Sequence, residues 1–379
     1  MAAYDVIVLG VGGMGSAAAY HLARRGQRVL ALERFALLHE MGSSHGFTRI
    51  IRLAYFEHPS YVPLLRRAYE LWESLERDSG EPLLHITGSV DAGLPDSRTF
   101  IGSLQTCEQH QLPHTVLTSA ELSRRFPGYR LPAEYMALLQ ERGGFLVPER
   151  CISAHTALAR KHGADVREHT RVLEWTPTTD GVTVRTDKGT FHAGRLVITA
   201  GSWSGALVPS LAPLLSPERQ VLGWFDIEDR DDFAPARFPV FNLDHEGEHW
   251  YGFPEFGTPG FKLGCYHHFR EVVDPDHLDR TRVTDRDLTL LREMARQCFP
   301  GAAGEPLLAK TCQFTNTPDE HFILDQLPDA PQVTVVSACS GHGFKFCSVV
   351  GEIAADLAID SGTRHDIALH RLSRFATPS

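Results

Sequence analysis

The chain lacks the cysteine patterns of disulfide-rich and zinc-binding proteins. Its seven cysteines are an odd number scattered over 379 residues, and no two of them form a C-x-x-C pair. Secreted scaffolds usually carry paired cysteines, and zinc sites usually carry cysteines at short fixed spacings. We therefore expect no disulfide framework and no metal site, and a reducing cytoplasm is the expected compartment.

The chain also lacks an excess of basic charge and any long apolar run. Acidic residues outnumber lysine and arginine by 47 to 37, so the formal net charge is −10. This balance argues against a nucleic-acid partner. No apolar run reaches the length of a membrane span, and the N-terminus carries neither a basic region nor a signal cleavage site. We therefore expect no membrane partner and no targeting segment.

The first 33 residues have the pattern of a dinucleotide-binding unit. Residues 4–10 form the continuous apolar run of a buried parallel strand, and GVGGMG at 10–15 has the form G-x-G-x-x-G. A predicted helix then runs to Gly26, and a second strand ends at Glu33. The glycines allow a pyrophosphate to reach the helix N-terminus, and Glu33 can accept hydrogen bonds from a ribose diol. The pattern predicts a dinucleotide but does not choose between NAD and FAD.

The next segment favours FAD over NAD. An NAD-dependent dehydrogenase would normally continue with another crossover helix, whereas MGSSHGFTRIIR at 41–52 is a polar loop that brings His45, Thr48, Arg49 and Arg52 together. If this segment is helical, the spacing places both arginines on one face. The two isoleucines between the arginines predict partial burial.

The remaining sequence predicts a two-domain chain. It has the length for two interleaved domains, and helices are expected over residues 60–78, 97–112, 118–126 and 284–299. Alternating apolar residues over 220–270 predict an antiparallel sheet, and a strand and helix over 333–360 return to the first domain. The predicted fold is α/β, with a Rossmann-like FAD-binding domain (residues 1–85, 145–215 and 310–379) and a largely antiparallel β substrate domain (86–144 and 216–309).

A lysine occupies an unusual position near the C-terminus. GHGFK at 341–345 lies between a buried strand and a buried helix, so Lys345 follows two glycines at a strand-to-helix corner. Such corners are usually closed by Asn, Ser or Asp. A cation at this place predicts an anionic partner.

Several segments together resemble one known family. They are DVIVLGVGGMGSAAAYHLARRG, GSSHGFTRIIRLAY, YGFPEFG, KLGCYHH, TCQFTNTPDEHF and SGHGFKF, and they occur in the family's order over nearly the whole chain. The chain is similar to the monomeric sarcosine oxidases, N-methyltryptophan oxidases and L-pipecolate oxidases, which are flavoproteins of the D-amino-acid-oxidase-like group. The resemblance implies a monomeric enzyme that carries FAD through a cysteine thioether and oxidises secondary amino acids with O2.

The resemblance also implies where the cofactor is held. Cys312 matches the attachment point, although most cysteines are small buried core residues. His45 and Arg49 match residues packed against the flavin ring, and Lys262 matches a lysine that assists O2 reduction. The other expected cofactor contacts are Gly10, Gly12, Gly13, Met14, Gly15, Glu33, Arg34, Ser43, Ser44, Thr48, Val172, Gly201, Trp203, Gly341, Gly343, Phe344 and Lys345.

The resemblance places the substrate above the flavin. Arg52 and Lys345 match the cations that bind the substrate carboxylate, so the anion expected at Lys345 is an amino acid. Tyr251 and either His267 or His268 match groups near the amine, and we favour His267 because it follows Tyr266 directly. Up to its first histidine, the segment KLGCYHH is one residue longer than the family's commoner KLGYH, so this register stays open.

The substrate itself stays open. Asn242 stands where sarcosine oxidases tend to place an apolar residue. The expected reaction is oxidative demethylation of an N-methyl amino acid such as sarcosine, which gives H2O2, formaldehyde and the primary amino acid. The alternatives are an oxidase of pipecolate, proline or a bulkier N-methyl amino acid, an NAD-dependent dehydrogenase, or a non-catalytic flavin-binding protein.

Overall fold

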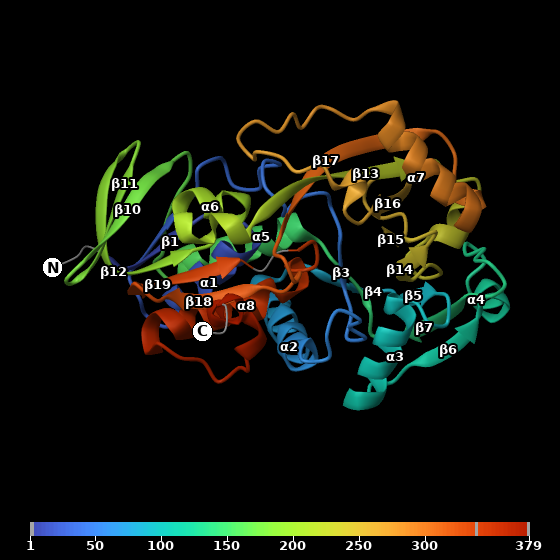
Figure 1. The fold of residues 1–379 in the computed structure, drawn as a ribbon, viewed down its shortest axis with the longest axis horizontal. Coiled ribbons are helices and arrows are strands. Elements are labelled where there is room, and N and C mark those ends of the chain that lie inside the picture. Colours follow the sequence, from blue (N-terminus) through green and yellow to red (C-terminus); the bar gives the residue numbers. More distant parts are fainter. Residues whose placement is uncertain (1–3, 338–339, 377–379) are drawn as a thin grey trace.

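The protein has two large β-sheets and a small connecting sheet, seen in a computed structural model that describes residues 4–337 and 340–376. Figure 1 shows one large sheet near the N-terminus and the other at the opposite end of the long axis. The first sheet has the order β10-β11-β12-β1-β2-β9, and β19 joins it beside β12 with β18 at its edge. Its strands are β1 (Tyr4–Leu9), β2 (Val29–Leu32), β9 (Asp165–Arg167), β10 (Val172–Thr178), β11 (Gly181–Thr186), β12 (Gly189–Ile198), β18 (Ile323–Leu327) and β19 (Ala330–Ser337).

The predicted dinucleotide unit is present in this sheet. β1 and β2 pair in parallel, and the helix between them, α1 (Gly13–Arg24), packs against α5 (Pro148–Lys161) and α8 (Cys347–Asp360). The middle of α1 is rich in alanine, and these small buried side chains let neighbouring helices approach closely. The predicted strand–helix return at the C-terminus corresponds to β19 and α8, and α8 also packs on α2 (Tyr61–Ser79).

The second sheet is largely antiparallel, as the alternating pattern over 220–270 predicts. Its order is β17-β13-β16-β15-β14-β5-β7-β6, and only β14 and β5 pair in parallel. The strands are β5 (Ser89–Gly93), β6 (Thr115–Thr118), β7 (Met136–Gln140), β13 (Ser216–Phe225), β14 (Val240–His245), β15 (Glu248–Phe253), β16 (Phe261–Cys265) and β17 (Pro306–Asn316). The helices of this half are α3 (Arg98–His110), α4 (Ser119–Arg125) and α7 (Asp285–Cys298), in agreement with the predicted ranges.

β17 changes the division of the chain between domains. This strand pairs with β13 along its whole length, so it belongs to the second sheet. The boundary expected at residue 310 falls inside it. We therefore propose that the return to the first domain begins after Asn316.

The third sheet lies between the two halves and carries the paired arginines. β3 (Arg49–Ile51) pairs with β8 (Gly144–Leu146), which also pairs with β4 (Leu84–Ile86). The segment is extended, so the condition for placing Arg49 and Arg52 on one helical face is not met. Side chains three residues apart on a strand leave on opposite faces, and the two arginines have different partners. Within residues 4–337 and 340–376, no helix is long and apolar enough to cross a membrane.

Candidate active site

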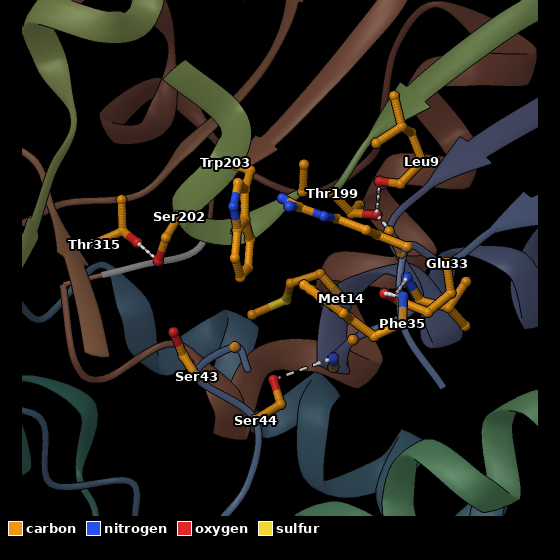
Figure 2. Close-up of a pocket in the computed structure, with 18 of the residues that line it drawn as sticks. Leu9, Met14, Glu33, Phe35, Ser43, Ser44, Thr199, Ser202, Trp203 and Thr315 are labelled. Atoms are coloured by element: carbon orange, nitrogen blue, oxygen red, sulfur yellow. Dashed lines mark hydrogen bonds between the residues drawn. The ribbon is translucent and has the colours of Figure 1, made fainter. Parts of the chain in front are cut away.

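The main cavity opens where the first sheet meets the loop at 41–52. It has a volume of about 320 Å³, and Figure 2 shows Met14, Glu33, Ser43, Ser44 and Trp203 around it. Most of the expected cofactor contacts line it, namely Gly10, Gly12, Gly13, Met14, Glu33, Arg34, Ser43, Ser44, Arg49, Val172, Gly201, Trp203, Gly341, Gly343 and Phe344. Five others do not line it: Gly15, His45, Thr48, Cys312 and Lys345.

The glycine turn forms one end of this cavity. Gly10 has a φ of +91°, and a Cβ there would lie 2.7 Å from the carbonyl oxygen of Thr199. A Cβ at Gly15 would lie 1.7 Å from the Gly10 oxygen, so this glycine allows the helix to pack on the turn. The first turn of α1 carries no acidic residue and its N-cap residue, Gly12, makes no side-chain cap. The exposed helix dipole and amides are suited to a pyrophosphate.

Glu33 is fixed at the neighbouring strand end. Its carboxylate accepts hydrogen bonds from the amides of Val11 (2.9 Å) and Phe35 (3.0 Å), and His39 Nε2 lies 3.3 Å away. Burial alone would raise the pKa of Glu33, but these donors outweigh it and hold the pKa below its usual value. The group therefore stays an acceptor, as a ribose diol requires.

An aromatic and ionic cluster closes the outer end of the cavity. The guanidinium of Arg34 lies over the rings of Phe35 and Trp203, at 5.0 and 5.6 Å from their centroids. Asp276 accepts hydrogen bonds from Arg34 and from Trp203 Nε1, both at 2.6 Å. The sequence reasoning missed Asp276, because it comes from the loop between β16 and α7 and belongs to no local motif. This planar, charged cluster is suited to the adenine end of a dinucleotide.

The residues present fit FAD. His45 is only 1% exposed, yet neither ring nitrogen has a hydrogen-bond partner among the described residues. Burial and the nearby positive charges of Arg49, Lys310 and Lys262 lower its pKa to about 3, so the ring is neutral. A buried imidazole without a protein partner predicts a polar group from a bound cofactor. The glycine turn, Glu33 and His45 would therefore hold the pyrophosphate, ribose and ring system respectively.

Cys312 lies close to Arg49. Its thiol is 3.9 Å from Arg49 Nη2, and the side chain packs in a small apolar cluster with Leu222 and Trp224. Arg49 is itself held by the carbonyl oxygens of Ser43 and Thr48. The Arg49 guanidinium therefore stands fixed beside the Cys312 sulfur. The six described cysteines are all free, and Cys312 is the one placed beside this cation.

Lys262 is buried and fully hydrogen-bonded. Its ammonium donates to the Gly46 oxygen (2.6 Å), the Thr48 oxygen (2.9 Å) and Thr48 Oγ1 (2.9 Å). It also lies 4.3 Å from the centroid of the Phe253 ring. Burial, with the charge of Arg49, lowers its pKa well below the usual value. Lys262 therefore fixes the segment that carries His45 and Arg49. This structural role is separate from the role in O2 reduction that the sequence predicts.

Arg52 and Lys345 meet around one aromatic ring. Their charged groups lie 4.5 and 5.2 Å from the centroid of Tyr55, and both side chains are at most 5% exposed. The Lys345 ammonium donates to the His342 carbonyl oxygen at 2.9 Å. Burial, together with the charge of Arg52, lowers the pKa of Lys345 to about 7. Two buried cations of this kind need an anion between them.

That anion is supplied in part by Glu57, which the sequence reasoning missed. Arg52 Nη2 lies 2.9 and 2.8 Å from the two oxygens of Glu57, and Arg52 Nη1 donates to the Ala54 carbonyl oxygen. Arg52 Nε has no hydrogen-bond partner among the described residues. Although burial opposes it, the positive charge of Arg52 lowers the pKa of Glu57 to about 2. The site is therefore built around a carboxylate.

Asn242 contacts Arg52 indirectly, through the carboxylate of Asp91. Its Nδ2 donates to Asp91 at 2.7 Å, and Ser103 donates to the other Asp91 oxygen at 2.8 Å. Asp91 in turn lies 3.8 Å from Arg52 Nε. Tyr251 pairs with Asn242 across two strands, and its ring packs against the cluster of Cys312. The polar Asn242 thus serves a buried network, and Tyr251 lies next to both Asn242 and the cluster of Cys312.

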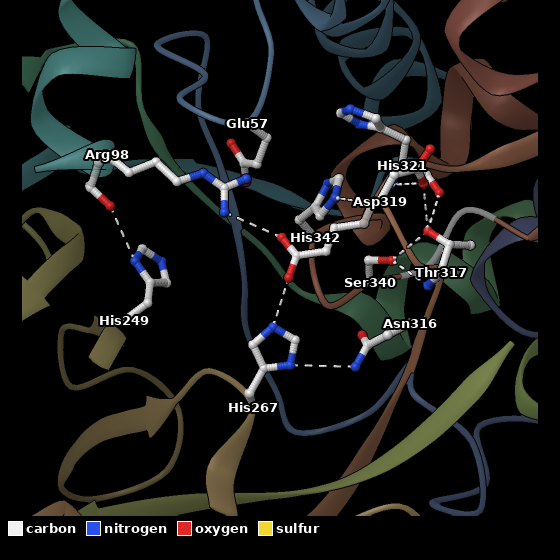
Figure 3. A network of polar contacts seen from close by, with 12 residues as sticks. Glu57, Arg98, His249, His267, Asn316, Thr317, Asp319, His321, Ser340 and His342 are labelled. Carbon is white, nitrogen blue, oxygen red and sulfur yellow. Dashed lines mark hydrogen bonds and ion pairs between the residues drawn. The ribbon is translucent and has the colours of Figure 1, made fainter. Parts of the chain in front are cut away.

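The two candidate histidines lie elsewhere. His267 lies 2.9 Å from Glu218 and 2.9 Å from Glu320, and it lines an outer cavity rather than the main one. Burial alone would lower its pKa, but the two carboxylates raise it. His268 is fully buried and lies 2.7 Å from Asp287. Figure 3 shows His267 and Arg98 directed toward the same carboxylate, and their contacts of 2.9 and 3.3 Å identify it as Glu320. The role of His267 near the amine stays a prediction, because the structure engages both its nitrogens with acids.

Comparison with known proteins agrees with this arrangement. A family model described as FAD dependent oxidoreductase matches residues 5–357. The chain is 44% identical to monomeric sarcosine oxidase of Streptomyces avermitilis over 380 residues, covering 98% of each chain. It is 36% identical to N-methyl-L-tryptophan oxidase of Salmonella dublin, covering 98% of this chain and 99% of that protein.

A solved structure extends the agreement to the fold. The open form of NikD, an unusual amino acid oxidase essential for nikkomycin biosynthesis, has a TM-score of 0.82 at 28% identity and covers 96% of each chain. The expected fold class and family are confirmed. The chain belongs to the FAD dependent oxidoreductase family, in the group that contains the monomeric sarcosine oxidases and N-methyl-L-tryptophan oxidases.

Proposed function

We propose that this enzyme is an FAD-dependent oxidase of secondary amino acids, with sarcosine or another small N-methyl amino acid as its substrate. The observation that carries the proposal is the pair of buried cations around Tyr55, one of which already holds a carboxylate. The similarity to sarcosine oxidases supports the reaction class. The enzyme would convert the N-methyl amino acid, O2 and water to the primary amino acid, formaldehyde and H2O2.

Arg52 and Lys345 would bind the substrate carboxylate. Arg52 offers its free Nε and the Nη2 now directed at Glu57, so a substrate carboxylate would take the place of that side chain. Lys345 adds a point charge without a fixed direction. This ionic contact is remote from the reacting C–N bond. Its binding energy would hold the substrate in the orientation that the reaction needs.

FAD, when bound, supplies the two-electron oxidation of the C–N bond and the transfer of both electrons to O2. We propose that it is attached covalently through Cys312, whose sulfur lies 3.9 Å from the Arg49 guanidinium. Lys262 would assist O2 reduction as a fixed, buried donor beside Arg49, because a preorganised polar group is effective when water is excluded. Tyr251 would form one wall beside the substrate amine.

We also propose that the enzyme is a monomer of the cytoplasm. The name of its sarcosine oxidase relatives supports the first statement, and the reduced, scattered cysteines support the second. An NAD-dependent dehydrogenase gives no reason for Cys312 beside Arg49 or for the cations around Tyr55. A bulkier N-methyl amino acid is the second candidate, because one group of relatives carries the name N-methyl-L-tryptophan oxidase.

A peroxide-coupled assay tests the proposal directly. Purified enzyme should release H2O2 with sarcosine and leave formaldehyde in equal amount. The panel should contain sarcosine, N-methyl-L-tryptophan, pipecolate, proline and an inactive primary amine. A different result would contradict the proposed N-demethylation: peroxide but no formaldehyde with pipecolate or proline, and no peroxide with sarcosine. The enzyme would then be an oxidase of a cyclic amino acid.

A further inference from the structure

The outer cavity lies directly beyond the carboxylate of Glu57. It has a volume of about 180 Å³, and Glu57 lines it together with Phe56, Arg98, His249, His267 and Glu320. Arg52 and Lys345 line neither cavity, so Glu57 separates them from this space. Glu57, the partner of Arg52, lines the outer cavity, and Gly343 and Phe344, which precede Lys345, line the main cavity.

Tyr266 forms the wall between the two cavities. It lines the outer cavity, while its ring packs on Phe314, with centroids 5.1 Å apart, and Phe314 lines the main cavity. A Cβ added to Gly341, which also lines the main cavity, would lie 2.6 Å from the Tyr266 ring and 2.6 Å from Phe314. The wall therefore consists of the Tyr266 and Phe314 rings, and at Gly341 the Tyr266 ring packs on a residue that has no side chain.

The ring is held firmly but its hydroxyl is not used. The Tyr266 amide donates to His249 O at 2.7 Å, and the His249 and His267 rings pack against the phenol edge-on. Among the described residues, the Tyr266 side chain contacts the rings of His249, His267 and Phe314, and these contacts do not use its hydroxyl. Burial and the charges of Glu320 and Glu57 raise its pKa well above the usual value, so it is a neutral donor across the physiological range.

We propose that Tyr266, rather than His267, is the residue of this turn that meets the substrate, and that its ring sets the size of side chain the enzyme accepts. This inference rests on the proposed function. A substrate with little or no side chain fits on the flavin side of the ring. A large side chain must cross the position of the ring to reach the outer cavity.

Three variants separate the ring from its hydroxyl. Tyr266→Phe keeps the wall and removes only the hydroxyl, so it is the matched control for Tyr266→Ala, which opens the wall. Tyr266→Leu is an intermediate truncation that keeps a branched apolar side chain, should the alanine variant lose its flavin spectrum or its cooperative melting. The readout is the ratio of kcat/KM for N-methyl-L-tryptophan to kcat/KM for sarcosine.

The expected result is a change in selectivity that follows ring size. Pocket fit of a few carbon atoms commonly changes kcat/KM by a factor of about ten or more. The ratio should rise at least about tenfold in Tyr266→Ala, rise less in Tyr266→Leu, and stay within about twofold of the parent in Tyr266→Phe. An unchanged ratio in folded Tyr266→Ala or Tyr266→Leu overturns the proposal, as does an equal change in Tyr266→Phe.

A binding measurement keeps this test separate from the proposed reaction. The holoenzymes are titrated with acetate and with indole-3-acetate, and the flavin absorbance change gives both dissociation constants. Opening the wall should improve binding of the larger acid relative to acetate, also by about tenfold or more. If the parent oxidises neither amino acid, the proposed function fails, and this affinity ratio still decides whether Tyr266 is the wall.

Discussion

Glu57→Gln should make the enzyme bind simple carboxylates more tightly. In the parent, a substrate carboxylate must displace Glu57 from Arg52 Nη2, where the two contacts are 2.9 and 2.8 Å. A charge-assisted hydrogen bond contributes about 1.5–3 kcal/mol. Glutamine keeps the shape but weakens the contact to an ordinary one of about 1 kcal/mol. The competitor is thus weakened by roughly 0.5–2 kcal/mol, which corresponds to a gain in affinity of roughly two- to thirtyfold.

The assay is a titration of the holoenzyme with acetate, followed by the flavin absorbance change. Glu248→Gln is the matched control, because Glu248 lines the same outer cavity but is exposed and makes no ion pair among the described residues. Its acetate affinity should stay within about twofold of the parent, as expected for a screened surface charge. Weaker or unchanged acetate binding in a normally folded Glu57→Gln variant would refute the competition between the two carboxylates.

Four further outcomes follow from the site. Cys312→Ser should release its flavin on acid precipitation. The control is Cys265→Ser, which changes another buried cysteine of the second sheet and should retain the flavin. Flavin found on a peptide with any other cysteine would reject Cys312 as the attachment point. Lys262→Met should slow flavin reoxidation in stopped flow by roughly a hundred- to thousandfold and should slow flavin reduction less. Equal loss in both half-reactions would leave Lys262 only the structural role of holding Gly46 and Thr48. Lys345 has a pKa lowered to about 7, and its charged form binds the anion. The affinity for acetate should therefore be constant below pH 7 and fall by up to tenfold per pH unit above it. A Lys345→Met variant that keeps this slope contradicts the assignment. Glu33→Ala should weaken binding of FAD to the apoprotein, measured by quenching of flavin fluorescence, and unchanged affinity would remove Glu33 from the cofactor site.

The sequence alone predicts the cofactor half of the molecule well, because its determinants are local. The turn at Gly10, the helix start at Gly13 and the acid at Glu33 lie within one βαβ unit, and the structure has all three around one cavity. Short-range backbone requirements and helix termini act over a few residues, so a pattern can represent them. Asp276 escapes such reasoning because a loop from the other domain brings it to the same cavity.

The substrate half is less predictable because its residues are brought together by contacts between segments that are distant in the sequence. Glu57 follows Arg52 by only five residues, yet nothing in the sequence indicates that its carboxylate turns back to the guanidinium. The choice between Tyr266 and His267 depends on the turn after β16, where His267 has a φ of +58° and bonds Glu320 from another strand connection. A shift of one residue in such a segment exchanges the faces of all its side chains.

The most direct test of the account compares two substrates in the absence of O2. Sarcosine and dimethylamine share the N-methyl group and the reacting C–N bond, but only sarcosine has the carboxylate that Arg52 and Lys345 would bind. Anaerobic stopped flow measures the rate of flavin bleaching with each. The account predicts that sarcosine reduces the flavin at least about a hundredfold more efficiently, and that Arg52→Gln removes most of this advantage. Equal reduction by dimethylamine, or an undiminished preference in the Arg52→Gln variant, would contradict it.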